Sequence, residues 1–254
     1  MKSLKTKIIH QIRLLQELGL AGYLSYSFRK NHMVKQNING KKVWIRIGTM
    51  DPNAATSCFN GEFDILEGLF PKDYSGVIVD AGGYIGTAAI AFSEMYPNAT
   101  VLTIEPSADN FYVLKKNVSK YPNIKPIHGA LIASDDKKIT LYNRNSGTWG
   151  FTVLKTPGDC PEAKEMEEIP AMRLSSLGVK MENIGILKLD IEGGEHALFS
   201  NDHKDLQLIP VIMIELHDRI IPGCSDLFFS FSKNRIVQKD EGEKYISIKK
   251  NFNQ

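Results

Sequence analysis

The sequence predicts an α/β fold in which helices cover a mostly parallel sheet, and three observations lead to this prediction. Apolar runs alternate with segments of helical spacing from residue 76 to residue 217, as in doubly wound sheets. The first run, "GVIVD", enters a turn with three glycines, which is typical of the first strand in such folds. The last segment, "NRIVQKDEGEKYISIKK", indicates a terminal antiparallel hairpin.

Each element of the main domain is inferred from its own pattern. Strands are expected at short apolar runs, which occupy residues 76–80, 100–104, 124–128, 138–142, 184–190 and 210–217. Helices are expected where apolar residues recur at helical spacing, at 86–96, 108–119 and 194–200. Residues 143–168 have little periodicity and contain two prolines and three glycines, so we expect a long loop there and a candidate lid.

Residues 1–70 are expected to form a helical and hairpin extension to the main domain at 71–254. Amphipathic helices are expected over 4–28. A small β-hairpin is expected over 33–47, because Asn39-Gly40 interrupts an alternating run. The N-terminal helices are the first place where a homodimer contact is expected.

Composition limits the classes of partner. The 31 basic and 29 acidic residues give a net charge of +2, too balanced for nucleic-acid binding by bulk electrostatics. No segment reaches the roughly 20 apolar residues of a membrane span, and Arg13 and Glu17 interrupt the apolar core that a secretion signal needs. The three cysteines lack disulfide or zinc spacing, so we expect reduced thiols and a cytoplasmic location.

The turn after the first apolar run carries a carboxylate beside its glycines. Gly82, Gly83 and Gly86 allow close approach of backbone to a ligand. Asp80 repels a pyrophosphate but suits a ligand with an amino group and a sulfonium, as in S-adenosylmethionine. The alternative is that Asp80 caps the next helix and the glycines only make a turn.

A second acid favours an adenosine ligand. Glu105 ends the next apolar run, 19 residues after Gly86, where a carboxylate accepts both ribose hydroxyls. NAD-binding and S-adenosylmethionine-binding proteins share such an acid. Glu105 therefore supports an adenosine group without choosing between the two cofactors.

Two further strand ends carry side chains that could act in catalysis or binding. Asp190 ends a buried run before the turn that contains Glu192, and a carboxylate there needs partners. Glu195 is expected mainly to interact with the dipole of the helix that follows. Strand alternation puts Glu215 and His217 on one face at the next strand end.

From about residue 41 to 231, five motifs in order resemble the FkbM-type S-adenosylmethionine-dependent methyltransferases. They are "IRIGTMDP", "VDAGGYIGT", "IEPSADNFYVLKKNV", "LKLDIEGGEHALF" and "IMIELHD". The resemblance implies a Rossmann-like class I methyltransferase fold, with a seven-stranded sheet and a C-terminal antiparallel hairpin. It also implies O-methyl transfer, often to sugars or natural products. Tyr84 departs from the Asn or His that is usual at its position, which leaves the role of that residue open.

The same resemblance implies roles for individual residues. The methionine part of the cofactor would contact Asp80, Gly82, Gly83, Tyr84 and Gly86. The ribose would contact Glu105, with Pro106, Ser107 and Asn110 beside it, and the adenine edge would lie along Gly129, Ala130 and Leu131. Asp190 would lie beside the transferred methyl group. The acceptor would meet a loop at Asn145–Thr152 that contains Trp149, together with Glu192 and Glu215.

Methyl transfer to a hydroxyl benefits from alignment and from a base. Asp190 or His217 is the predicted base. No metal is expected, although Asp190, Glu215 and His217 are an alternative set of ligands for a divalent cation. The other hypotheses are a methyltransferase with a nitrogen or carboxylate acceptor, an NAD(P)-linked oxidoreductase or epimerase, and a non-catalytic binding module.

Overall fold

The computed structural model describes residues 33–240 and 242–250. The chain divides into two compact units, Met1–Ile65 and Leu66–Gln254. The helices expected over 4–28, and the dimer contact expected on them, lie outside the described residues.

The first unit contains the predicted hairpin. Strands β1 (Met33–Ile38) and β2 (Lys41–Arg46) pair antiparallel. Asn39 and Gly40 turn the chain with φ values of 49° and 81°, the left-handed conformation that an Asn-Gly hairpin turn needs. Helix α2 (Asp51–Phe59) follows, and the buried carboxylate of Asp51 accepts hydrogen bonds from Arg46 N, Nε and Nη2 at 2.8–2.9 Å.

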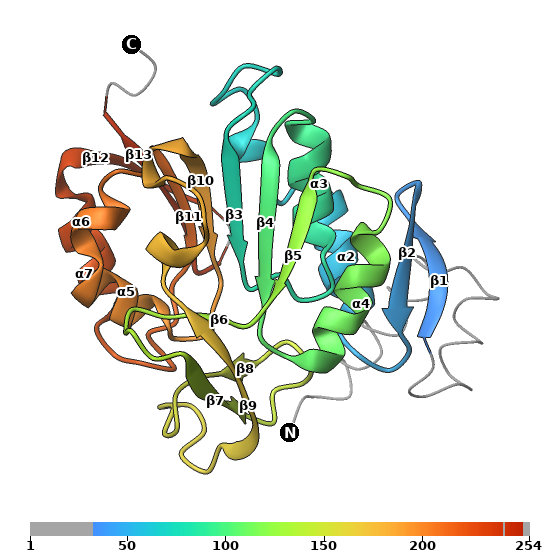
Figure 1. The fold of residues 1–254 in the computed structure, drawn as a ribbon. Helices are drawn as coiled ribbons and strands as arrows, with labels where there is room; N and C mark the ends of the chain where they lie inside the picture. Colours follow the sequence, from blue (N-terminus) through green and yellow to red (C-terminus); the bar gives the residue numbers. More distant parts are fainter. Residues whose placement is uncertain (1–32, 241, 251–254) are drawn as a thin grey trace. The chain divides into compact units, whose positions relative to one another are not determined.

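The second unit is built on a seven-stranded sheet with the order β12-β13-β11-β10-β3-β4-β5 (Figure 1). Its parallel strands are β3 (Val77–Ala81), β4 (Thr100–Glu105), β5 (Ile124–His128), β10 (Ile184–Leu189) and β11 (Val211–Glu215). Strand β13 (Lys244–Lys249) lies antiparallel between β11 and β12 (Arg235–Lys239). The predicted fold class and terminal hairpin are confirmed.

The central strands are apolar because both faces of the sheet are covered. Every residue of β3 and β10 is buried, as expected of parallel strands between two layers. Helices α3 (Thr87–Met95) and α4 (Ala108–Val118) lie beside β3, β4 and β5. Helices α5 (Glu195–Asn201), α6 (His203–Leu206) and α7 (Cys224–Phe231) follow β10 and β11, and α5 packs against α7 (Figure 1).

A second, four-stranded sheet corrects the expectation that residues 143–168 form one long loop. It has the order β6-β9-β7-β8, with β6 (Ala130–Leu131), β7 (Lys138–Asn143), β8 (Phe151–Thr152) and β9 (Lys164–Met172). The sequence did not indicate strand β9, because Glu165, Met166 and Glu168 are all exposed. A register shift against β7 at Leu141/Tyr142 further interrupts the alternation of buried and exposed residues. Among the described residues, the apolar side chains of this four-stranded sheet form one small cluster, which includes Leu141 and Ile169.

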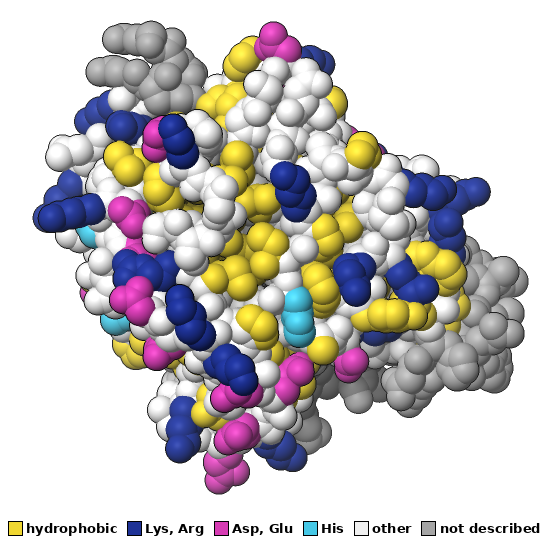
Figure 2. Space-filling view, in the orientation of Figure 1, with side chains coloured by type: hydrophobic (Ala, Val, Ile, Leu, Met, Phe, Trp, Pro, Cys, Tyr) yellow, Lys and Arg dark blue, Asp and Glu magenta, His cyan; other side chains and the backbone are white. Residues whose placement is uncertain are grey.

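Charges of both signs are dispersed over the visible face of the protein, with acidic groups concentrated over β7 and β9 (Figure 2). This distribution matches the small net charge of +2. Among the residues with described positions, no helix combines the length and the apolar character needed to cross a membrane.

Arg235 joins the terminal hairpin to the sheet, and its replacement by Met is the first testable change. Its Nε donates to Ser247 Oγ at 2.8 Å, and its Nη2 donates to the carbonyls of Ile209 and Pro210 at 2.9 Å. Burial lowers the pKa of Arg235 to about 10. Because Arg235→Met removes these charged hydrogen bonds and deprives the Ile209 carbonyl of its arginine donor, we expect urea unfolding to show a loss of about 3 kcal/mol in the free energy of unfolding. The exposed Lys233→Met is the control and should change the unfolding free energy by less than about 0.5 kcal/mol.

Candidate active site

The glycine turn after β3 packs directly against the end of β10. Gly82 has a φ of 85°, and a Cβ added there would lie 1.8 Å from the carbonyl oxygen of Asp190. A Cβ at Gly83 would lie 2.2 Å from Thr103 Oγ1. These positions therefore require glycine, and the packing brings the predicted cofactor turn next to the predicted catalytic carboxylate.

Asp80 is paired with a lysine that the sequence reasoning missed. The side chain of Asp80 is fully buried, accepts a hydrogen bond from Thr103 Oγ1 at 2.8 Å, and lies 3.2 Å from Lys188 Nζ. Lys188 also donates to the carbonyl of Gly82 at 3.1 Å and lies 3.7 Å from Asp190. The turn thus presents an ion pair, because the β10–β3 register sets Lys188 opposite Asp80.

The alternation in "LKLD" was the available signal for Lys188, since it puts this residue on the same strand face as Asp190. The alternative role of Asp80 as a helix cap finds no support. Gly86 is the N-cap of α3, and no side chain caps that helix.

Glu105 is held rigidly at the end of β4. Its carboxylate accepts hydrogen bonds from Tyr84 N at 2.8 Å, Ser107 N at 2.9 Å and Asn110 Nδ2 at 3.1 Å. Ser107 also caps α4 by accepting from Asn110 N at 3.4 Å. The glycine turn and the start of α4 therefore meet at one buried carboxylate.

The segment at 144–150 is tied to the same residues. The hydroxyl of Tyr84 lies 2.8 Å from Thr148 Oγ1, and Asn110 Nδ2 donates to the carbonyl of Thr148 at 2.8 Å. Trp149 next to it is half exposed, and its indole N–H donates to the Ser146 carbonyl at 2.6 Å. Tyr84, whose role the sequence left open, links the glycine turn to this segment.

The link at Tyr84 gives a second testable change. Tyr84→Phe removes the hydroxyl that meets Thr148 while keeping the ring. We expect the amides of residues 146–150 to exchange hydrogen about 3- to 10-fold faster, which corresponds to roughly 1 kcal/mol for one hydrogen bond. Tyr112→Phe on the exposed face of α4 is the matched control. Unchanged exchange in both variants would contradict the link.

Ala130 and Leu131, the predicted adenine edge, are buried in β6, where they pair with β9. Leu131 packs in the main core and Ala130 in the core of the small sheet. Their side chains serve packing, and the adenine contact at these residues stays a prediction. Pro106 is partly buried, and its carbonyl lies 3.0 Å from His128 Nε2.

His217 is the centre of a buried charge cluster. Its imidazole is fully buried, and its Nδ1 lies 3.1 Å from Glu195 Oε1. Glu195 also accepts hydrogen bonds from the backbone N–H groups of Ile191 at 2.7 Å and Gly193 at 2.8 Å. Glu195 lies in the first turn of α5, as expected, but its carboxylate also orients His217, which the sequence did not indicate.

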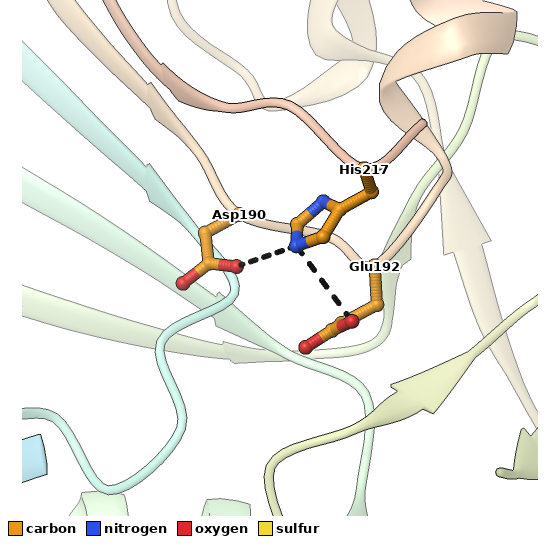
Figure 3. A group of neighbouring side chains, drawn as sticks. All are labelled: Asp190, Glu192 and His217. Carbon is orange, nitrogen blue, oxygen red and sulfur yellow. Dashed lines mark ion pairs between the residues drawn. The ribbon is translucent and has the colours of Figure 1, made fainter. Parts of the chain in front are cut away.

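The other imidazole nitrogen faces three carboxylates. Nε2 of His217 lies 3.8 Å from Asp190, 3.7 Å from Glu192 and 3.9 Å from Glu215, and Figure 3 shows the first two converging on it. These distances exceed hydrogen-bond length, and Nε2 has no hydrogen-bond partner. The structure therefore brings together Asp190, Glu192, Glu215 and His217, each of which the sequence analysis had named as a candidate site residue.

Two buried groups of this cluster, His217 and Glu192, have shifted pKa values. Burial opposes charge on His217, but Glu195, Asp190 and Glu192 outweigh it and raise the pKa of His217 to about 10. Burial raises the pKa of Glu192 to about 7, with His217 and Arg144 acting in the opposite direction and Asp190 adding to the rise. The imidazole is therefore protonated at neutral pH in this arrangement.

Arg144 is a second residue that the sequence reasoning missed. Its buried guanidinium forms ion pairs with Glu192 and Asp159, and its Nε donates to the Gly150 carbonyl at 3.2 Å. Arg219 also lies 3.2 Å from Asp159. The only sequence signal was the position of Arg144 at the head of "RNSGTWG". Arg144 connects the 144–150 segment to the His217 cluster.

Comparison with known proteins adds independent observations. Residues 80–232 match the family model described as "Methyltransferase FkbM domain". "Methyltransferase 1" of Beauveria bassiana (strain ARSEF 2860) is 28% identical over 169 residues, which cover 59% of this chain and 67% of that protein.

Two solved structures illustrate the structural relatives. Methyltransferase FkbM from Methylobacillus flagellatus KT has 16% identity and a TM-score of 0.47, over 71% of this chain and 45% of that one. TYW2 of M. jannaschii, solved in complex with AdoMet, has 10% identity and a TM-score of 0.47, over 87% of this chain and 85% of that one. The present chain thus matches less than half of the Methylobacillus protein.

Proposed function

Because the chain belongs to the FkbM methyltransferase family, we propose that this S-adenosylmethionine-dependent methyltransferase domain methylates a hydroxyl of a sugar, a glycan precursor or a related small molecule. The family assignment supports methyl transfer over the NAD(P)-linked and non-catalytic alternatives. The acceptor and the roles of the site residues are the proposed part.

The methionine end of the cofactor fits the pair at the glycine turn. Asp80 offers a buried carboxylate oxygen without a hydrogen-bond partner, and Lys188 lies 3.2 Å from it. An amino acid carries one ammonium and one carboxylate group, so an acid and a base side by side match its two ends. Glu105, fixed by three N–H donors, is the proposed ribose contact.

S-adenosylmethionine supplies a methyl group on a positively charged sulfur. The chain contributes alignment and proton removal. Asp190 is the proposed base because its side chain is 35% exposed and lies beside the glycine turn. When the acceptor oxygen bonds to the methyl carbon, the carbon–sulfur bond would break to release S-adenosylhomocysteine, and the proton of the acceptor would pass to the Asp190 carboxylate. His217, protonated through a pKa of about 10, is better suited to balance the negative charge of the carboxylates around it than to act as the base itself.

One observation carries the choice of an oxygen acceptor. The partly exposed carboxylate of Asp190 lies beside the cofactor turn. Together with Glu192 and Glu215 it surrounds the imidazole of His217. Hydroxyl groups need such a base more than amines do, since a neutral amine is already nucleophilic. The half-exposed indole of Trp149 supports a sugar, because an indole packs well against the apolar face of a sugar ring.

Calorimetry of cofactor binding tests the first half of the proposal. We expect S-adenosylmethionine and S-adenosylhomocysteine to bind, and Glu105→Gln to weaken both by about 10- to 100-fold, as for 1.5–3 kcal/mol at one charged hydrogen-bonding group. Glu182→Gln, at an exposed glutamate, should leave affinity unchanged. Equal affinity in both variants would remove Glu105 from the cofactor site.

Acceptor screening tests the second half. The protein is incubated with methyl-labelled S-adenosylmethionine and panels of sugars, phenols, amines and carboxylic acids, and label transfer is measured. Label confined to the hydroxyl panels supports the proposal, and label confined to amines or carboxylic acids contradicts it. The cytoplasmic location and the dimer contact through 4–28 remain predictions from the sequence.

A further inference from the structure

We propose that Asp190, Glu192 and His217 bind a divalent cation of the Mn²⁺ or Zn²⁺ type. The ligand atoms of these three residues all lie within 4.8 Å of one another (Figure 3). This differs from the set that the sequence offered as an alternative, because Glu192 replaces Glu215. The binding site itself does not depend on the identity of the methyl acceptor.

The spacing of the ligand atoms favours a cation over a bridging water. Bonds of about 2.1 Å to one metal ion separate neighbouring ligand atoms by roughly 3.0–3.4 Å, whereas a tetrahedral water with hydrogen bonds of about 2.8 Å separates them by roughly 4.6 Å. His217 Nε2 lies 3.8 Å from Asp190 Oδ1 and 3.7 Å from Glu192 Oε2. Both distances from Nε2 are closer to the metal spacing than to the water spacing, and rotation of the two carboxylates toward Nε2 would complete the coordination of an ion among ligand atoms that lie within 4.8 Å of one another.

The orientation of His217 is the independent observation that points to a ligand. The imidazole is fully buried, and its Nε2 points into the carboxylates without a hydrogen-bond partner. The other nitrogen lies 3.1 Å from Glu195, which is fixed by two backbone N–H groups. With Nδ1–H facing Glu195 and the Nε2 proton displaced by the incoming cation, the imidazole would take the arrangement that metal-binding histidines adopt.

The backbone at Glu192 is strained in a way that aims its carboxylate at this point. Glu192 has a φ of 51°, which costs a non-glycine residue of order 1 kcal/mol and tends to occur at functional sites. Thr152 Oγ1 donates to the Glu192 carbonyl at 2.7 Å and holds that conformation. Arg144 pairs with the same side chain, so a bound cation shares Glu192 with the guanidinium.

The ligand types select the class of cation. One imidazole and two carboxylates suit Mn²⁺ or Zn²⁺, whereas Ca²⁺ and Mg²⁺ prefer sites made only of oxygen. Glu215, 3.9 Å from Nε2, is near enough to supply a further oxygen. A cation at this point would polarise an acceptor hydroxyl beside Asp190, and that consequence alone rests on the proposed function.

Binding of Mn²⁺ to the EDTA-treated full chain tests the proposal. Mn²⁺ is added stepwise and the free ion is measured by electron paramagnetic resonance. We expect one equivalent to bind, Zn²⁺ to displace it, and Mg²⁺ at equal concentration to leave it bound. Asp190→Asn and Glu192→Gln should each weaken binding at least 10-fold. Glu195→Gln, a change at a positioning residue, should weaken it about 10- to 100-fold.

Matched controls separate the site from general effects. His196→Gln and Glu182→Gln, outside the cluster, should bind Mn²⁺ like the unmodified chain, and circular dichroism checks that each variant is folded. Failure to bind Mn²⁺ or Zn²⁺ at millimolar concentration overturns the proposal, as does equal binding by folded Asp190→Asn. Cofactor calorimetry in EDTA separates the cation site from the methyltransferase function. Cofactor binding without Mn²⁺ binding overturns the cation site alone, whereas Mn²⁺ binding without cofactor binding overturns the proposed cofactor site alone.

Discussion

Glu195→Gln is expected to lower the free energy of unfolding by about 3–5 kcal/mol. The change removes the charge that faces His217 at 3.1 Å while leaving the imidazole buried, and breaking one side of a buried charged pair typically costs this much. It also replaces the carboxylate that accepts from two backbone N–H groups. The measurement is urea unfolding of the cation-free protein.

The pH dependence of stability gives the same prediction a second readout. The pKa of His217 rises from 6.5 to about 10 in the folded chain, so its contribution is complete below about pH 6.5 and is lost as the pH rises to about 10. Burial raises the pKa of Glu192 from 4.5 to about 7, so its contribution to stability also falls with rising pH, between about pH 4.5 and 7. The unfolding free energy should therefore fall from about pH 6.5 to 10, and this slope should be shallower in Glu195→Gln.

A double-variant cycle distinguishes a specific pair from a general packing defect. Adding His217→Gln to Glu195→Gln removes the unpaired imidazolium charge. The double variant should therefore lose less unfolding free energy than the sum of the losses in the two single variants. Glu182→Gln is the neutral control at an exposed position. Additive losses in the double variant, with an unchanged pH slope in Glu195→Gln, would contradict the pairing.

Asp190→Asn is expected to lower kcat by about 10²- to 10⁴-fold, the usual contribution of a general base. The amide keeps the shape of the side chain but accepts no proton at neutral pH. We expect S-adenosylmethionine affinity to change by less than about 10-fold, because the methionine contacts are proposed at Asp80 and Lys188 instead. Initial rates at saturating cofactor give kcat, and calorimetry on the same preparations gives the affinity for S-adenosylmethionine.

The split between rate and affinity decides the role of Asp190. A loss of cofactor affinity as large as the loss of kcat would assign it to cofactor binding alone, and an unchanged kcat would exclude it as the base. Asp73→Asn, at an exposed aspartate, should leave both quantities unchanged. Any rate that remains in Asp190→Asn measures how much alignment contributes without a base.

Local patterns were sufficient for most of the fold. Five of the six predicted strands form the parallel part of the main sheet, because a strand buried on both faces is mostly apolar, and β3 and β10 depart from this only at Asp80 and Lys188. Asn39-Gly40 predicted the hairpin turn because few other residue pairs adopt left-handed φ at both positions. The polar strand β9 was missed, since one weakly covered face leaves little apolar alternation to detect.

The sequence by itself determined the parallel α/β core, the glycine turn and the strand ends that carry Asp80, Glu105, Asp190 and His217, because each depends on neighbours within a few residues. Only the tertiary structure decided which charges meet. Lys188 faces Asp80 across 108 positions through the β10–β3 register, and Arg144 reaches Glu192 across 48 positions. Such pairs leave no local periodicity, since only strand register and tertiary packing bring them together.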